Sequence, residues 1–437
     1  MREIGISADE LVGRLLALPG ERRVSILDSS GVGHLGSHLL IAGFDPVESI
    51  EISGENAQET IAIFEEKLSG DLFGVFTISY NLGLKLEKIK PRTKKFDAFP
   101  EPDIYLALFE TLIIHDYGTG KTYLTGKENR FDQVERALLS ATPFAQAESR
   151  GLSCNFQSNF TKGEYISAIG QIKEYIRHGD TYQTNLTQQL RVKLPDNATP
   201  QRIFLNLRRD HPAAFAAFIG RGGSTVVSAS PERFFKVSED RSISTSPIKG
   251  TRPRGKTPDE DNALRNELLT SVKDRAENVM IVDLLRNDIG RICEFGSVHV
   301  EKLCDLEEHP SLFHLVSTVN GELRPGIMIS DILRAVFPCG SITGAPKIRT
   351  MQIIDEIETA DRGLSMGAIG VYLPPSWDLG LGTWDLSVAI RTMVIRDGEA
   401  VFNVGGGIVI DSDPEKEYEE SMLKSRALLE AFGVDRS

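Results

Sequence analysis

Lys249 is the residue of this chain whose type and position most directly suggest covalent chemistry. It stands in the segment Pro247-Ile-Lys-Gly-Thr251, after the alternating stretch Arg241–Ser246, which predicts a strand. A lysine at the end of a strand and shielded from water can lose its proton and attack an electrophilic carbon. Gly250 would let a ligand or a second backbone segment come close. The alternative is a lysine in a solvated loop, because lysine is rarely buried without a partner.

Two predicted helices each carry a pair of carboxylates. In the first, Asp274 and Glu277 are three residues apart and share a face. The second has Asp413 as its N-cap, a proline in its first turn, and Glu417 and Glu420 three residues apart. Carboxylates from two helices could hold Mg²⁺, which keeps several waters and leaves room for an anionic substrate. The alternative is two ordinary solvated helix faces.

Three features of the C-terminal half are suited to binding anions. Gly405-Gly406-Gly407 interrupts a strand of buried type. Glycine destabilises a strand, so three glycines there suggest that something approaches the backbone closely. Main-chain N–H groups at such a place can cradle a carboxylate. Arg391 is predicted inside an apolar strand, where it could clamp a carboxylate or form an internal salt bridge. The tight loop Gly340–Lys347 opens a helix and is a further possible anion cradle.

The sequence pattern around these residues predicts a chain of mixed helices and strands. Four segments show clear periodicity, Glu21–Asp28 and Ile104–Ile114 for strands, and Asn56–Leu68 and Thr161–His178 for helices. The last begins with a Thr161/Glu164 capping box. A polar run at Gln146–Asn155 predicts a connection, which divides the chain into a part spanning 1–150 and a part spanning 160–437. The second part holds nearly all the chemistry-bearing residues.

Two glycine-rich segments resemble nucleotide-binding loops without the context that such loops require. Gly31–Gly36 matches Gly-x-Gly-x-x-Gly, but a strand and a turn are expected after it instead of a helix. Gly118–Thr122 resembles the end of a phosphate-binding loop, but His115 stands where the first glycine is needed. Its flanking strands predict a hairpin tip. The sequence therefore does not support dinucleotide or ATP binding.

Composition describes an ordinary globular protein with an excess of acidic residues. The 437 residues are 41% hydrophobic and carry a net charge of −13, which argues against nucleic acid or an anionic membrane as partner. No stretch reaches the roughly 18 apolar residues of a membrane helix, and the N-terminus is too charged for a signal peptide. Four widely spaced cysteines without a Cys-x-x-Cys pair fit reduced thiols. We expect a cytoplasmic protein.

Six segments occur in an order typical of one enzyme family: Ser230–Phe234, Pro247–Thr251, Arg275–Asp288, His314–Ser317, Gly340–Lys347 and Gly406–Ser412. Together they closely resemble the chorismate-utilising enzymes, which include the anthranilate, aminodeoxychorismate, isochorismate and salicylate synthases. The resemblance spans residues 160 to 432, and the first 150 residues fit the family's more variable N-terminal part. It implies an α+β fold, two halves of mostly antiparallel sheet with outer helices, and a site between the halves.

Two positions point to one branch of this family. Lys249 resembles the lysine of the aminodeoxychorismate synthases, where anthranilate synthases usually carry alanine. Gln183 occupies the position that is lysine in the water-using isochorismate and salicylate synthases, which implies ammonia as the second substrate. No cysteine lies in the Gly-x-Cys-x-Gly elbow of a glutaminase, so the resemblance implies a separate glutamine amidotransferase subunit. The alternatives are an anthranilate synthase and a non-catalytic regulatory relative.

The resemblance also implies a mechanism. Lys249 would attack C2 of chorismate while Glu232, as general acid, protonates the departing C4 hydroxyl. Ammonia would then add at C4 and expel the lysine. Desolvation in a closed pocket, or alternatively Mg²⁺ and neighbouring arginines, would favour the neutral lysine that attack requires. Partial burial would raise the pKa of Glu232 so that this carboxyl keeps its proton.

The remaining candidate residues are implied to bind the metal and the substrate. Glu277 and Glu420 would hold Mg²⁺, with Asp274 and Glu417 behind them. The expected substrate ligands are Arg391, Lys424, Gly406, Gly407, Thr343, Gln183 and His314. For His314, an orienting role and a catalytic role both stay open. Tyr372 is not assigned, because Val371 stands where the family usually has the tyrosine credited with substrate contact.

Overall fold

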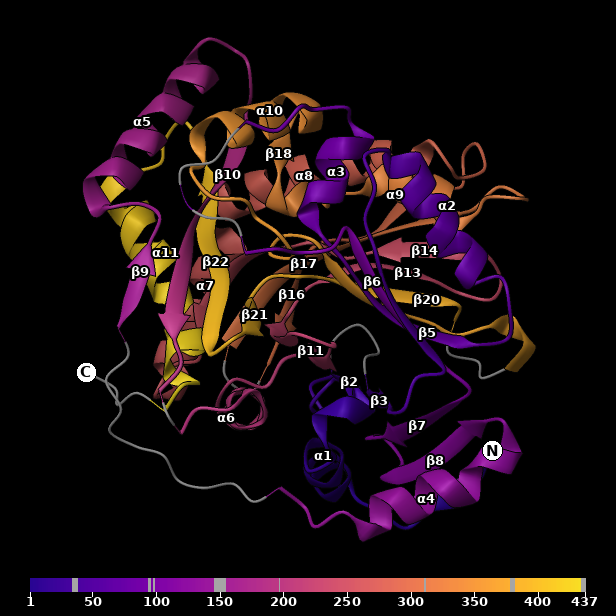
Figure 1. Cartoon of the computed structure of the whole chain (residues 1–437). Helices are drawn as coiled ribbons and strands as arrows, with labels where there is room; N and C mark the ends of the chain where they lie inside the picture. Colours follow the sequence, from indigo (N-terminus) through magenta and orange to yellow (C-terminus); the bar gives the residue numbers. More distant parts are fainter. Residues whose placement is uncertain are drawn as a thin grey trace.

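Two large sheets, built from strands of both parts of the chain, form the framework of the protein. The computed structural model describes residues 1–33, 38–92, 96, 99–144, 155–195, 197–309, 312–377 and 382–433. The first sheet has 12 strands and the second has 10, and neighbouring strands pair in antiparallel fashion. This is the α+β architecture that the sequence predicts, with the helices packed outside (Figure 1).

The first sheet joins five strands from before residue 150 to seven that follow it. In spatial order its members are β1 (Arg2–Ile4), β8 (Lys121–Gly126), β7 (Thr111–Asp116), β3 (Leu39–Gly43), β2 (Ser25–Asp28), β11 (Phe215–Gly220), β12 (Thr225–Ser230), β21 (Thr392–Arg396), β22 (Glu399–Ile408), β10 (Gln183–Lys193) and β18 (Gly344–Ala345), with β9 (Phe156–Ser158) beside β10. The two parts meet where β2 pairs with β11.

The second sheet is composite in the same way. Its order is β15 (Ile248–Pro253), β17 (Leu312–Glu322), β14 (Ser242–Thr245), β13 (Arg233–Val237), β20 (Trp384–Val388), β19 (Ala368–Tyr372), β5 (Phe73–Ile78), β6 (Ile104–Phe109) and β4 (Glu48–Ile52), with β16 (His299–Glu308) beside β17. Here the N-terminal strand β5 pairs with β19. The segment 1–150 therefore completes both sheets and does not form a sheet of its own.

Helices cover the outer face of each sheet. One apolar core packs the first sheet against α1 (Ala8–Leu16), α4 (Phe131–Ser140), α6 (Pro200–Asp210) and α11 (Pro414–Glu430). A second packs the other sheet against α2 (Ala57–Lys67), α3 (Tyr80–Leu86), α8 (Val272–Gly290) and α9 (Ile329–Val336). Figure 1 shows α2, α3 and α9 along one side of the second sheet. A third core, with Ile41, Val75 and Ala217, lies between the two sheets.

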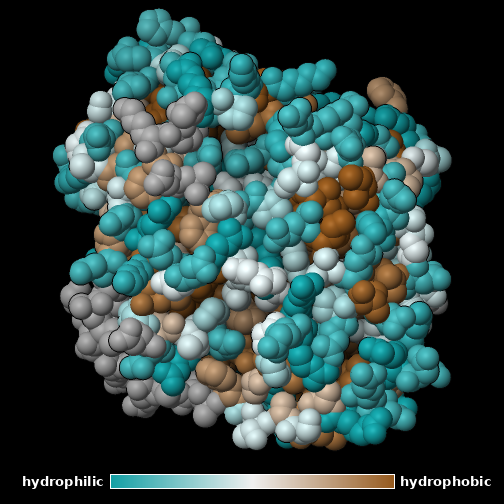
Figure 2. Space-filling model, in the orientation of Figure 1, coloured by the Kyte–Doolittle hydropathy of each residue, from teal (hydrophilic) through white to brown (hydrophobic). Residues whose placement is uncertain are grey.

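The remaining helices lie beside these cores: α5 (Lys162–Arg177), α7 (Pro258–Thr270) and α10 (Lys347–Ile357). Within the described residues, no helix combines the length and the apolar character needed to cross a bilayer. The face shown in Figure 2 is largely hydrophilic, with small and separated apolar patches. Cys293, Cys304 and Cys339 are buried free thiols, in agreement with the reduced cysteines that the sequence predicts.

Most of the predicted helices and turns are confirmed. Asn56 caps α2, the Thr161/Glu164 capping box starts α5, Asp413 caps α11, and Gly118 lies in the β7–β8 hairpin. The predicted connection Gln146–Asn155 lies outside the described residues, except for Asn155. The end of the Gly31–Gly36 segment also lies outside them.

Two strand predictions are wrong in detail. The expected strand Ile104–Ile114 is two strands, β6 and β7, which join different sheets. Both are buried on both faces, so their apolar sequences run on without the alternation that would mark the break. The expected strand Glu21–Asp28 is ordered as β2 only from Ser25, after a 3₁₀ turn at Gly20–Arg22.

A buried ion pair connects the two sheets and allows a test of their packing. Arg221, which follows β11, donates to Glu101 at 2.9 Å and to Thr77 of β5 at 2.8 Å. Replacement by Arg221→Met leaves the Glu101 carboxylate buried and unpaired, so we expect a loss of about 3–5 kcal/mol in the free energy of unfolding, measured by urea denaturation.

The exposed pair between Lys121 and Glu3 supplies the control, since Lys121→Met should cost less than about 1 kcal/mol. The double variant Arg221→Met/Glu101→Gln should be less destabilised than Arg221→Met alone. Equal stability of Arg221→Met and the wild type would show that the pair does not hold the sheets together.

Candidate active site

Lys249 lies in strand β15 and is half-buried. Its Nζ donates to the main-chain carbonyl of Ser341 at 3.1 Å. The alternative of a lysine in a solvated loop is therefore wrong. The pairing of β15 with β17 is irregular between Ile248 and Thr251, so the strand is distorted where the lysine stands.

Gly250 allows helix α8 to approach this strand closely. Its φ is +86°, and a Cβ there would lie 3.0 Å from the Cβ of Asp274 and 2.8 Å from Leu268. Arg252, two residues further along β15, donates to the Asp274 carboxylate at 3.1 Å and to Glu267 at 2.8 Å. This ion pair and the missing side chain together fix β15 against α8.

Glu232 is buried where the chain passes from the first sheet to the second, between β12 and β13. Its Oε1 is buried without a hydrogen-bond partner in the described part of the chain. Burial raises the pKa of this carboxyl, and the Ser341 hydroxyl and the Lys249 ammonium offset the effect only in part. A carboxyl of this kind can hold a proton and deliver it to a leaving group.

Lys249 faces carboxyl groups from three different elements. Its charge interacts with Glu232, with Glu277 on α8 and with Glu420 on α11. Lys249 itself is only half-buried. The fold nevertheless brings together the two predicted catalytic residues and one carboxylate from each predicted acidic helix.

The carboxylates of α8 and α11 are in different environments. Burial raises the pKa of Glu277, against the influence of Lys249 and Lys273. Burial would also raise the pKa of Glu420, but the ammonium groups of Lys424, Lys273 and Lys249 outweigh it and hold that pKa below its ordinary value. Lys424 pairs with Glu420 at 2.8 Å. Both helices thus carry at least one acidic group that faces Lys249, so the alternative of purely solvated helix faces is wrong.

Lys273 lies between the two acidic helices. Its Nζ is 3.9 Å from Glu277 Oε1 and 3.8 Å from Glu417 Oε1. Glu417 is buried and also accepts a 2.7 Å hydrogen bond from Ser412. A cationic side chain is thus already balancing the negative charge of this region.

Glu277 and Glu420 are the predicted ligands of Mg²⁺. Within the described ranges, no group of three or more His, Cys, Asp or Glu residues is arranged to hold a metal ion. Mg²⁺ often takes only one or two carboxylates and completes its shell with water and substrate oxygens. Glu277, whose buried Oε1 accepts no hydrogen bond from a described residue, and Glu420 fit this chemistry. Asp274 and Glu417 are engaged by Arg252 and Ser412.

The three consecutive glycines of β22 meet three different neighbours. A Cβ on Gly405 would lie 1.9 Å from the Leu186 carbonyl oxygen, and one on Gly407 would lie 2.0 Å from Gln183 Nε2. A Cβ on Gly406 would lie 3.4 Å from Glu417 Oε2 and 3.6 Å from Lys424 Nζ. Gly406 therefore faces the acidic helix α11, and Gln183 packs on Gly407.

Arg391 differs from its prediction in conformation and partners. It precedes β21 and has a φ of 48°, so it lies in a bend and not inside a strand. Its guanidinium forms no ion pair with any residue that the structure describes, and burial lowers its pKa. The internal salt bridge is not found in the described chain. A desolvated cation without a counter-ion is suited to binding a carboxylate.

Thr343 and His314 are held by contacts within the protein. Thr343 is fully buried, and its hydroxyl donates to the carbonyls of Cys339 and Gly340 at 3.1 and 3.3 Å. This residue stiffens the predicted anion loop instead of reaching toward a ligand. The His314 Nδ1 lies 2.9 Å from the hydroxyl of Thr251, two residues after Lys249. That contact suits a residue which orients β15.

Three residues of this region were missed by the sequence reasoning: Ser341, Lys273 and Arg252. Each lies within or next to a segment that the sequence had singled out, but only their contacts with Lys249, Glu277 and Asp274 show what they touch. Charge alone could have drawn notice to Lys273 and Arg252. Nothing in the sequence distinguished Ser341.

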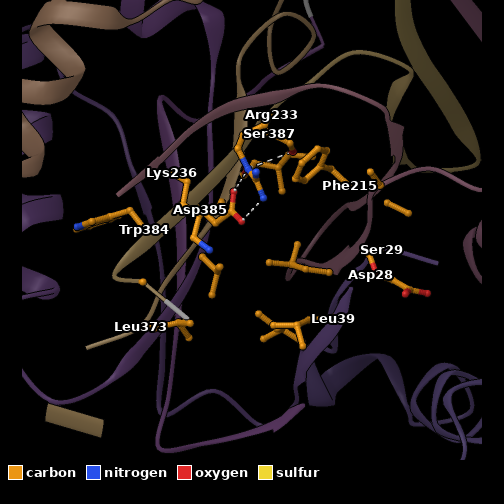
Figure 3. Close-up of a pocket in the computed structure, with 18 of the residues that line it drawn as sticks. Asp28, Ser29, Leu39, Phe215, Arg233, Lys236, Leu373, Trp384, Asp385 and Ser387 are labelled. Carbon is orange, nitrogen blue, oxygen red and sulfur yellow. Dashed lines mark hydrogen bonds and ion pairs between the residues drawn. The ribbon is translucent and has the colours of Figure 1, made fainter. Parts of the chain in front are cut away.

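A separate cavity of about 170 Å³ lies between the two sheets and contains none of the predicted site residues. Figure 3 shows Arg233 and Asp385 paired at its edge, and Trp384 and Leu373 on its wall. Tyr372 lies beside this region and packs on Trp384, with ring centroids 4.5 Å apart.

The glycines of β22 give a matched pair of substitutions. Gly405→Ala would force a Cβ into a main-chain carbonyl, so we expect it to cost roughly 3 kcal/mol. Gly406→Ala meets only ordinary contacts and should change stability by less than about 1 kcal/mol. Thermal and urea denaturation of both variants would measure this difference. Similar losses in both would contradict the assignment of Gly406 to an open face.

Comparison with known proteins agrees with this geometry. The model of the chorismate binding enzyme family matches residues 36–430. Aminodeoxychorismate synthase component 1 of Escherichia coli is 39% identical over 360 residues, covering 82% of this chain and 76% of that protein. Anthranilate synthase component 1 of Aquifex aeolicus is 36% identical over 415 residues, covering 89% of this chain and 80% of that protein.

A solved structure shows the same fold. The anthranilate synthase component I of Streptococcus pneumoniae superimposes with a TM-score of 0.77 at 27% identity, covering 91% of this chain and 93% of that one. Relatives with two different activities are thus similar to this chain to nearly the same extent. Together with the six ordered segments and the cluster around Lys249, these matches show that the chain belongs to the chorismate-binding enzyme family.

Proposed function

We propose that this protein is the synthase component that converts chorismate and ammonia to 4-amino-4-deoxychorismate. The observation that carries the proposal is that the half-buried Lys249 amine, which donates to the Ser341 carbonyl at 3.1 Å, acts electrostatically on the buried Glu232 carboxyl. A nucleophile and a proton donor in one pocket are what the substitution of a ring hydroxyl requires. A family member with alanine in place of Lys249 would lack the first of these groups.

The chemistry proceeds in two exchanges on the ring. Lys249 Nζ forms a bond to C2, the ring double bond shifts, and the C4 hydroxyl leaves as water with the proton of Glu232. Ammonia then bonds to C4, the double bond shifts back, and the C2–N bond to Lys249 breaks. The proton that the added ammonia loses returns to the Glu232 carboxylate, and Lys249 is released as the free amine. The product retains the enolpyruvyl group and carries an amine in place of the C4 hydroxyl. The net reaction consumes one ammonia and releases one water.

Charged groups around this pair are suited to holding the substrate carboxylates. Arg391 is a desolvated cation without an ion-pair partner among the described residues, and Lys424 donates to the Gly405 carbonyl beside Gly406. Glu277 and Glu420 would hold Mg²⁺. When bound, this ion would supply a positive charge that orients the ring carboxylate and draws electron density from the ring.

Ammonia is proposed to come from a separate glutamine amidotransferase in the cytoplasm. Gln183 packs on Gly407 and is neutral. It stands at the position where the members of the family that use water carry a lysine. The relatives from Escherichia coli and Aquifex aeolicus both bear the designation component 1, which is consistent with a second component. Synthesis of anthranilate is the second candidate, because relatives with that activity are similarly close and His314 lies next to β15.

The proposal is tested by identifying the product. The purified chain is incubated with chorismate, Mg²⁺ and an ammonium salt in mildly alkaline buffer, and the product is analysed by mass spectrometry. We expect an aminated product that retains the enolpyruvyl group and that an added lyase converts to 4-aminobenzoate. Free anthranilate would overturn this assignment in favour of the second candidate, and unchanged chorismate would favour a non-catalytic relative.

Lys249→Ala should lower the rate of amination by at least about a thousandfold, because it removes the covalent nucleophile. The fold should be retained, since the side chain is half-buried and makes one hydrogen bond to Ser341. The assay uses saturating ammonia and compares Lys302→Ala, an exposed lysine on β16, as control. Undiminished turnover by Lys249→Ala would exclude the covalent role.

The pH dependence of kcat should report Glu232. A general acid works only while it is protonated, and burial raises its pKa, so activity persists to higher pH than an exposed glutamate would allow. As the pH rises through the raised pKa, kcat at a constant concentration of free ammonia should fall. Glu232→Gln should lose this limb and retain about 10⁻² to 10⁻⁴ of the rate. A wild-type profile that keeps rising with pH would contradict the role.

A further inference from the structure

Arg362 is a buried arginine whose guanidinium uses all three of its nitrogens within the protein. Its Nε and Nη2 donate to the Glu358 carboxylate at 2.9 and 2.7 Å. Nη1 donates to the carbonyl of Ile342 at 3.0 Å, and Nη2 also donates to the carbonyl of Asn185 at 2.7 Å. The guanidinium lies over the ring of Tyr80, 4.6 Å from the centroid. One rigid, planar group thus joins a carboxylate to two separate main-chain segments.

Both of these segments carry residues of the candidate site. Asn185 follows Gln183 by two residues in β10. Ile342 directly follows Ser341, whose carbonyl accepts the hydrogen bond from Lys249 Nζ at 3.1 Å. The guanidinium is therefore a buried link between the strand that carries Gln183 and the loop that holds the Lys249 amine.

Glu358 extends this link along β10. Its Oε1 accepts hydrogen bonds from the main-chain N–H of Thr187 at 2.8 Å and from the Thr187 hydroxyl at 3.0 Å. On the side of the loop, the main-chain N–H of Asn185 donates to the carbonyl of Thr343 at 2.8 Å. The strand is thus held at two residues that share one of its faces, and this restrains the direction in which Gln183, on the same face, can point.

We propose that Arg362 is a positioning residue, which together with Glu358 fixes the strand of Gln183 relative to the loop that holds Lys249. The inference rests on the proposed function, since it takes Lys249 as the group that bonds to C2 and Gln183 as a neighbour of the ammonia that bonds to C4. Both bonds form on one ring, so the two side chains need a fixed separation. An error of about 1 Å in such a constellation can cost roughly a hundredfold in rate.

The shape of the guanidinium allows its positioning role to be separated from its charge. Arg362→Lys still places an ammonium group beside Glu358, so the buried carboxylate keeps a counter-ion. A single nitrogen cannot take the place of three nitrogens in a planar fork, however, so the bonds to the carbonyls of Asn185 and Ile342 are lost together.

Arg208→Lys is the matched control. Arg208 is a largely buried arginine that also has several partners, and it donates to Asp28 at 2.7 Å, to Asp9 at 2.6 Å and to the Tyr117 hydroxyl at 3.0 Å. None of these residues belongs to the candidate site. Its replacement disturbs a buried network of similar size in another part of the first sheet.

The full-length variants and the wild type are compared in three measurements. Hydrogen exchange with mass spectrometry reports the protection of peptides that cover 183–187 and 340–343, without any turnover. Steady-state kinetics give kcat and the KM values for chorismate and ammonia. In ¹⁸O-labelled water, a water molecule that bonds to C4 of the lysine adduct in place of ammonia expels the lysine and reforms chorismate with a labelled hydroxyl. The ratio of labelled chorismate to aminated product measures how well ammonia is placed.

In Arg362→Lys we expect both peptides to exchange about tenfold faster or more, because the link that restrains them is lost. Its kcat should fall about tenfold or more, while KM for chorismate changes less than about threefold, since the proposed ligands of the substrate carboxylates are untouched. The ratio of labelled chorismate to aminated product should rise. Arg208→Lys should match the wild type in the exchange of both peptides, in kcat and in this ratio.

Unchanged exchange of the two peptides in Arg362→Lys would overturn the inference, and so would a loss of kcat that Arg208→Lys shares or a loss confined to KM for chorismate. If Arg362→Lys does not fold, Thr187→Val decides, because it removes one bond from β10 to Glu358. Wild-type exchange and kcat in that variant would contradict the role. Failure of the proposed function looks different: the wild-type chain would then make no aminated product, while hydrogen exchange would still report the link.

Discussion

The fixed packing of the two sheets against each other is the constraint on which the candidate site depends. The candidate residues come from both sheets: Gly406 and Gln183 from the first, and Lys249 from the second. Glu232 lies at the connection between them. The apolar core between the sheets and the buried ion pair of Arg221 hold this relation. A shift of one sheet would separate Lys249 from the candidate residues of the other sheet.

Electrostatic balance is the second organising feature. Carboxylates from α8 and α11 converge near Lys249, and lysines on the same helices offset part of their charge. Some acidic groups are tied into ion pairs or hydrogen bonds, as with Asp274 and Glu417, whereas Glu277 keeps a buried oxygen without a hydrogen bond among the described residues. This asymmetry distinguishes carboxylates that hold the fold together from those that are open to a cation.

Secondary structure was predictable where the signal is local. The caps of α2, α5 and α11 and the β7–β8 hairpin depend on a few neighbouring residues, so the sequence identifies them directly. The break between β6 and β7 was not predictable from periodicity, because both strands are buried on both faces. The left-handed conformation of Arg391 was missed for a related reason, since its neighbours read as a continuous apolar strand.

The sequence by itself determined the family, the α+β class and the set of candidate residues, because ordered motifs carry that information without coordinates. Tertiary structure alone decided which of them meet. It placed Lys249 against Ser341, tied Asp274 to Arg252 and turned Thr343 into a support for its own loop. These contacts join segments as many as 92 residues apart. Pairings of that range arise from sheet order and helix packing, which no local pattern in the chain encodes.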